Sequence, residues 1–412
     1  MRLLAFVCVA WFAVAPSFAG SGPASGTKKA VPAPPVVEKK QAHQKFVLDV
    51  VRMAVALPQS DAQDRLRVLE TATRVVMPLD AQLAKQFTTE GVRLETQLIA
   101  GGARPAVSIF SAGAIDCSLA GPFIDSVPPD GVDRAGESLM AVISACPGGT
   151  RVPLRRKLDA ALESGYVSAR PLLALMEAEG PHSAWSQETF AKMFRSLPKG
   201  QEQIFEAPNY AAMLTEMVPA VDKDVAAKAG VSFLEWLGQF NNTSARNLTV
   251  NMVMGPLREA LGEEKLQEAL RSSVVAQGVA RSEGQPGEIE HPEEEGVSVL
   301  AAMDDHGDQT ARLKDLPSSK RAREAAAHGF ASGTSGNRKL ADKYFDMAYA
   351  ALDQVWAERS PEKNTPAVVE EVSEAAAQVD AVAALQRAQR LADPSAQAIS
   401  MLAVARVVGN RD

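Results

Sequence analysis

The chain of 412 residues has few aromatic side chains, which make up 5% of it, whereas hydrophobic residues make up 46%. Most of the hydrophobic residues are alanine, valine and leucine. Small side chains of this kind suit closely packed helices better than a β-sandwich, which favours β-branched and aromatic positions. We therefore expect an all-α fold. The stretch 104–113 is the one candidate for a strand.

Cysteine is also scarce, with three residues in the whole sequence. Cys8 lies in the apolar N-terminal run, which leaves Cys117 and Cys146 as an even pair. Such a pair predicts a disulfide in an oxidising compartment, and the alternative is two small buried thiols. The segment 125–133 lies between the cysteines and has the composition of a turn, so a helical hairpin could bring them together.

Long hydrophobic runs are absent beyond the N-terminus. Arg2 precedes an apolar core from Leu3 to Val14, and a small-x-small site ends at Ala19. This pattern predicts a secretory signal peptide over residues 1–19, since the run is shorter than the roughly 20 residues that span a bilayer. We expect a mature chain in the periplasm or outside the cell, without a transmembrane segment.

Catalytic and nucleotide-binding signatures are missing as well. The sequence contains no HExxH, no GxxxxGK[ST], no GxGxxG after a strand, no GxSxG and no CxxCH. The net charge of −7 gives no electrostatic reason to expect a nucleic-acid partner. These absences favour a role without catalysis and without a cofactor. The alternative is an exported hydrolase whose site combines His182, His306 or His328 with a distant carboxylate.

The remaining sequence is organised as helical segments separated by short breaks. A flexible leader rich in Pro, Gly, Ser and Lys covers 20–40, and an N-terminal helical domain covers 41–278. An acidic linker follows over 279–297, and a C-terminal helical-hairpin domain covers 298–412. Near the start of the first domain, Ser60 and Gln63 have the spacing of a capping box for a helix.

Lysine and arginine are absent between Ser282 and Ala311, where nine carboxylates occur. Asp304, His306 and Asp308 with His291 form a candidate metal site within this acidic window, because carboxylates and imidazoles are suitable ligands. The spacing does not follow the calcium-loop pattern. The alternatives are a solvated acidic linker, whose last carboxylates favour a helix start, and a docking segment for a basic partner.

Gly329, Ala341, Phe345 and Ala348 fall at the relative spacing of four consensus positions of one known repeat. The segment therefore resembles the tetratricopeptide repeat, a helix-turn-helix unit that stacks into a superhelix. It departs from that pattern at His328, Ser332 and Asp353.

Further along, Asp393 and Pro394 have the order of an N-cap and a first helical residue. The resemblance implies stacked antiparallel helical hairpins and a binding surface. We expect an exported α-solenoid-like protein that acts as a protein-interaction or scaffold module. A cation-binding role for the acidic segment is a further alternative.

Overall fold

The computed structural model describes residues 36–113, 116–146, 148–165, 169–272, 309–359 and 364–410. All regular elements within these ranges are helical and none is a β-strand, which confirms the all-α prediction. The candidate strand at 104–113 instead contains a 3-10 helix, η1, at Ile109–Ala112. No α-helix in the described ranges is long and apolar enough to cross a bilayer.

Residues 36–272 form the first series of helices. Its α-helices are α1 (Val36–Ala56), α2 (Ala62–Val76), α3 (Ala81–Ala100), α4 (Ala120–Ser126), α5 (Gly136–Ala145), α6 (Arg151–Glu163), α7 (Ala169–Glu179), α8 (Ala184–Arg195), α9 (Ala207–Met217), α10 (Lys223–Gly238), α11 (Thr243–Leu261) and α12 (Glu263–Ser272). Its further 3-10 helices are η2 (Cys117–Leu119), η3 (Pro129–Gly131) and η4 (Gln201–Glu206).

Residues 309–410 form the second series. Its helices are α15 (Thr310–Lys314), α16 (Ser318–Thr334), α17 (Arg338–Ala357), α18 (Thr365–Val379), α19 (Ala381–Ala388) and α20 (Pro394–Gly409). Asp393 caps α20 by accepting the N–H groups of Ser395 and Ala396, and Pro394 occupies the first turn, as the sequence predicts.

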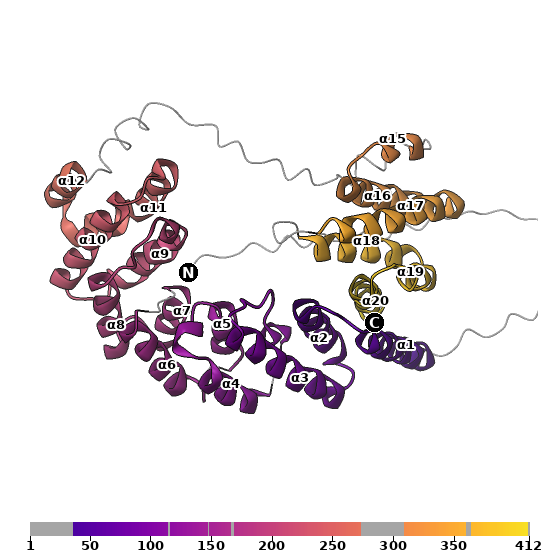
Figure 1. Cartoon of the computed structure of the whole chain (residues 1–412), viewed down its shortest axis with the longest axis horizontal. Helices are drawn as coiled ribbons and strands as arrows, with labels where there is room; N and C mark the ends of the chain where they lie inside the picture. The colour runs from indigo at the N-terminus through magenta and orange to yellow at the C-terminus, as the bar shows by residue number, and fades with distance from the viewer. Residues whose placement is uncertain are drawn as a thin grey trace, which may run out of the picture.

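The helices of the first series lie in two rows along an open arc (Figure 1). The inner row follows the contacts of α5 with α7, α7 with α9 and α9 with α11. The outer row contains α4 beside α6, and α10 between α8 and α12. The two rows contact each other where α6 packs on α7, α8 on α7 and α9, and α10 on α9 and α11. Between α8, α9 and the end of α10 the rows enclose a buried aromatic cluster, which consists of Phe190, Phe194, Tyr210, Phe233, Trp236 and Phe240.

The second series contacts the N-terminal end of the arc, where α20 lies against α1 and α2 (Figure 1). Helix α20 also contacts α18 and α19, so its residues are buried around most of its circumference. A helix that is apolar on all sides is stable in water only when neighbours surround it. The first and last described helices of the chain are therefore packed together.

An ion pair adds to this junction. The Nη1 of Arg359, just after α17, donates to Oδ2 of Asp64 in the first turn of α2 at 2.6 Å. The Arg359 guanidinium also lies over the Trp356 ring, 4.9 Å from its centroid. A cation–π contact of this kind restrains the guanidinium and favours its pairing with Asp64.

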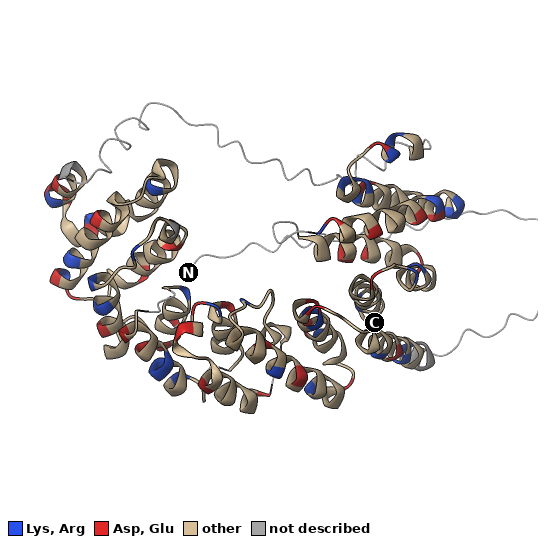
Figure 2. Cartoon of the chain, viewed as in Figure 1, with Lys and Arg blue, Asp and Glu red and all other residues tan. Residues whose placement is uncertain are grey.

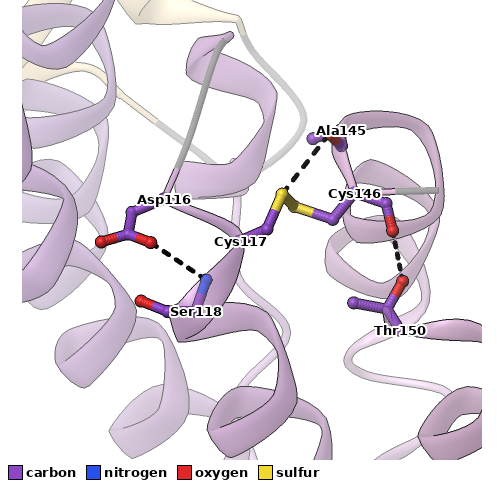
Figure 3. The surroundings of a disulfide bond; sticks show 6 residues. All are labelled: Asp116, Cys117, Ser118, Ala145, Cys146 and Thr150. Carbon is purple, nitrogen blue, oxygen red and sulfur yellow. Dashed lines mark hydrogen bonds between the residues drawn. A yellow bond between two sulfur atoms is a disulfide. The ribbon is translucent and has the colours of Figure 1, made fainter. Parts of the chain in front are cut away.

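The predicted disulfide between Cys117 and Cys146 is present (Figure 3). Cys117 begins η2 and Cys146 caps the C-terminus of α5, and their Cα atoms are 5.6 Å apart. Helix α4 and the 3-10 turn η3 lie between them in sequence, but α4 packs mainly on α6 and η2 and α5 on α7 and η1, so the two cysteines are not brought together by a hairpin of α4 on α5. The bond holds the end of α5 beside η2.

Candidate functional site: a charged cavity

A cavity of about 850 Å³ lies where the two series of helices meet. Its walls come from α2, the segment 104–111, α5, α18 and α20. Residues far apart in the sequence therefore meet there only in the folded chain. Its charged lining residues are Arg67, Glu70, Arg74, Arg104, Glu137, Glu370 and Arg406. Figure 2 shows acidic and basic residues mixed along these helices, without a region of one sign.

Helix α2 presents one face to the cavity. Arg67, Glu70, Thr71 and Arg74 are three or four residues apart in sequence, and this spacing places them on the same side of a helix. Glu70 is buried, pairs with Arg74 and lies 3.3 Å from the Oγ of Ser111 on the opposite wall. The carboxylate therefore connects α2 to η1 within the cavity lining.

Gln63 fixes the backbone of the segment 104–111. Its Nε2 donates to the carbonyl oxygen of Arg104 at 2.9 Å, and its Oε1 accepts the N–H of Ala106 at 2.8 Å. Two hydrogen bonds from one amide thus hold the irregular part of this segment, at Arg104 and Ala106, before η1 begins. The predicted capping box at Ser60 and Gln63 is wrong, because Asp61 caps α2 and accepts the Gln63 N–H.

Glu95 of α3 also holds the segment 104–111, through a hydrogen bond to its backbone. Its carboxyl group is fully buried, accepts the Ile109 N–H at 3.0 Å and is hydrogen-bonded to the Ser138 hydroxyl on α5. Burial raises its pKa to about 7, although bonds from Ser138, Ile109 and Ser108 oppose the shift. No cation among the described residues is paired with it. Glu95 thus joins α3, η1 and α5 behind the cavity wall.

Two of the cavity's arginines are held by glutamates. Arg74 pairs with Glu70, and Arg406 lies 3.0 Å from Glu370 and also pairs with Glu374. Glu137 is paired as well, with Arg170 outside the lining. All three glutamates of the lining therefore have a cationic partner.

Arg67 and Arg104 differ from the other arginines of the lining. Neither forms an ion pair within 4.0 Å in the part of the chain that the structure describes. Arg104 is exposed and has only a longer-range attraction to Asp133. Arg67 is half-buried on α2. Their guanidinium N–H groups are the ones in this cavity that can bind a ligand without breaking an ion pair.

A second, smaller cavity of about 420 Å³ adjoins the charged one. Ser111, Ala141 and Ser144 line both, so the two spaces are adjacent. The remaining walls of the smaller cavity are mainly apolar and include Phe110 and Ala145. The combined site therefore has a charged end and an apolar end.

The sequence-predicted metal ligands Asp304, His306, Asp308 and His291 lie outside the described residues. Within the described ranges, no group of three or more His, Cys, Asp or Glu side chains could hold a metal ion. The other two histidines of the hydrolase hypothesis are not among the residues that line either cavity. His182 is exposed before α8, and His328 is buried in α16, where its ring stacks on Tyr344.

Sequence reasoning did not identify Arg67, Arg104 or Gln63 as site residues. Arg67 stands at an ordinary polar position of an amphipathic helix, and Arg104 lies in a segment read as a candidate strand. Gln63 was interpreted as a capping residue. Arg67 and Arg104 line a cavity only because α20 and α18 pack near α2 in the folded chain.

No protein-family model, curated protein or solved structure matches this chain.

Proposed function

We propose that this chain is an exported helical-repeat protein that acts as a protein-interaction or scaffold module. In this proposal, residues 1–19 direct export and the described helices form an α-solenoid-like array of stacked hairpins. The partner binds at the charged cavity. The observation that carries the proposal is the cavity itself, with walls that Gln63 and Glu95 fix before any ligand is bound. Preformed walls reduce the entropy lost on binding.

The packing of the second series supports the repeat interpretation. Helices α16 and α17 form an antiparallel hairpin, and α18 packs on α16. Gly329 in α16 faces Phe345 in α17, and the Phe345 ring lies too close for a side chain at position 329. This is the close helix contact that the tetratricopeptide-like spacing of these two residues implies. Repeated hairpins of this type form extended binding surfaces.

A capture experiment with a blocked cavity tests the function. The chain from Gly20 onward is immobilised as wild type and as Ser144→Trp, which places a large ring at an exposed position shared by both cavities. Thr89→Trp is the matched control, because Thr89 is exposed on α3 and does not line either cavity. An envelope extract from the native cell is passed over each.

We expect a discrete partner to bind wild type and Thr89→Trp and to be lost from Ser144→Trp. Thermal melts confirm that both variants are folded. Equal capture by all three proteins, or capture by none, would contradict a partner site in the cavity.

A further inference from the structure

The charge balance of the cavity favours an anionic ligand. Four arginines and three glutamates line it, and each glutamate is already paired. The spare guanidinium groups belong to Arg67 and Arg104, on α2 and on the facing segment. Guanidinium binds carboxylates through paired N–H groups, and the interaction is strengthened where water is partly excluded.

The same balance favours a singly charged anion. A phosphate dianion carries two negative charges, whereas the lining has an excess of only one arginine over the glutamates, and it would lie near Glu70, Glu137 and Glu370. A carboxylate carries one charge and matches the excess of one arginine over the glutamates in the lining. Like charges at short range oppose binding, so the carboxylate is the better fit.

The adjoining cavity requires an apolar group next to that carboxylate. Phe110, Ala141 and Ala145 line it, and Ser111 and Ser144 lie at the boundary with the charged cavity. A ligand that fills both spaces has a carboxylate at one point and an apolar side chain a few bonds away. The last residue of a peptide has this arrangement, with the side chain and the carboxylate on one carbon atom.

The polar part of the lining distinguishes a peptide from a fatty acid. Thr71, Ser108 and Ser111 line the charged cavity, and their hydroxyl oxygens can interact with amide groups. A fatty-acid chain offers these oxygens no amide N–H donor, and it would need a longer apolar channel than the smaller cavity of about 420 Å³.

We infer that the site binds the free C-terminus of a peptide or partner protein that ends in an apolar residue. The terminal carboxylate lies between Arg67 and Arg104, and the last side chain enters the space beside Phe110 and Ala145. The inference rests on the proposed function and specifies its ligand.

The test uses the chain from Gly20 onward and the tripeptide acetyl-Ala-Ala-Val, as the free acid and as the C-terminal amide. Calorimetric titration measures binding to wild type, Arg67→Gln and Arg104→Gln. Arg93→Gln is the matched control, because Arg93 is exposed on α3 and lies outside both linings. Arg104 is also exposed, so its substitution should leave the fold intact, and thermal melts verify this for every variant.

We expect the acid to bind wild type and Arg93→Gln at least tenfold more tightly than the amide. Arg67→Gln and Arg104→Gln should each lose at least tenfold in affinity for the acid. Equal binding of acid and amide, no binding of the acid to folded wild type, or tighter binding of decanoate than of the peptide would overturn the inference. If these occur while Ser144→Trp still abolishes partner capture, the proposed function stands and only the ligand assignment fails.

Discussion

Glu95 in α3 accepts the backbone N–H of Ile109 at 3.0 Å, and this bond attaches the segment 104–111 to the helices behind it. The carboxyl group is buried and its pKa is raised to about 7. In the unfolded chain the same carboxyl has a pKa near 4.5. The folded protein therefore binds more protons than the unfolded chain between these two values.

This difference predicts how stability changes with pH. The contribution of Glu95 is fully present below pH 4.5 and is lost as pH rises through about 7. The loss is at most about 3.5 kcal/mol, because each pKa unit corresponds to about 1.4 kcal/mol. In Glu95→Gln the free energy of unfolding should fall less between pH 5 and pH 8 than in wild type. Urea unfolding at several pH values measures the change of the free energy of unfolding with pH in both proteins.

Glu268→Gln is the control for this measurement, because Glu268 is exposed on α12. In this variant the free energy of unfolding should change with pH as it does in wild type. If Glu95→Gln and Glu268→Gln have the same pH dependence, the buried carboxyl is not the source of the effect.

The sequence predicted the elements that local chemistry determines. The helix start at Asp393 and Pro394 is set by adjacent residues, and the disulfide by the presence of only two cysteines after residue 19. The cavity could not be predicted in this way. It requires α20 to pack on α1 and α2, and nothing in the pattern of α20 identifies its neighbours, because its apolar residues face all directions.

Gln63 has the sequence spacing of a capping-box residue but a different role in the folded chain. Gln63 stands three positions after Ser60, which is the spacing of a capping box. Asp61 caps the helix instead, and the Gln63 side chain is free to bond Arg104 and Ala106, more than forty residues away. A local pattern gives no information about a bond of this range.

Removal of the disulfide should lower stability without removing the fold. The bond between Cys117 and Cys146 closes a loop with a sequence separation of 29 residues. Loop-closure entropy then predicts that Cys117→Ser with Cys146→Ser lowers the free energy of unfolding by about 3.5 kcal/mol. Reductant should produce a similar loss in wild type and no change in the double variant. A reductant effect of equal size in both proteins would show that the bond contributes nothing.

The close approach of α16 to its neighbours should depend on two glycines. A Cβ atom at Gly329 would lie 2.9 Å from Cε1 of Phe345, and one at Gly333 would lie 2.5 Å from Cγ1 of Val379. Gly329→Ala and Gly333→Ala should therefore each destabilise the fold by about 1–3 kcal/mol through overpacking.

Gly409 at the end of α20 provides the matched comparison. A Cβ there would lie 3.8 Å from Cγ2 of Val47, an ordinary contact, so Gly409→Ala should stabilise the fold by up to about 1 kcal/mol. Thermal and urea unfolding give the three values. Stabilisation by all three substitutions would mean that the helices are not packed this closely.

The pair of Asp64 and Arg359 tests the junction of the two series in solution. A double-mutant cycle with Asp64→Asn and Arg359→Gln should give a coupling energy of about 1 kcal/mol, because the Asp64 side chain is only 12% exposed. The pair of Arg338 and Asp380 lies within the second series and is more exposed, at 70% and 39%. Its coupling should be smaller and should disappear in 1 M salt. If Asp64 and Arg359 show no coupling while Arg338 and Asp380 show the small coupling expected of them, the second series folds without docking on α2.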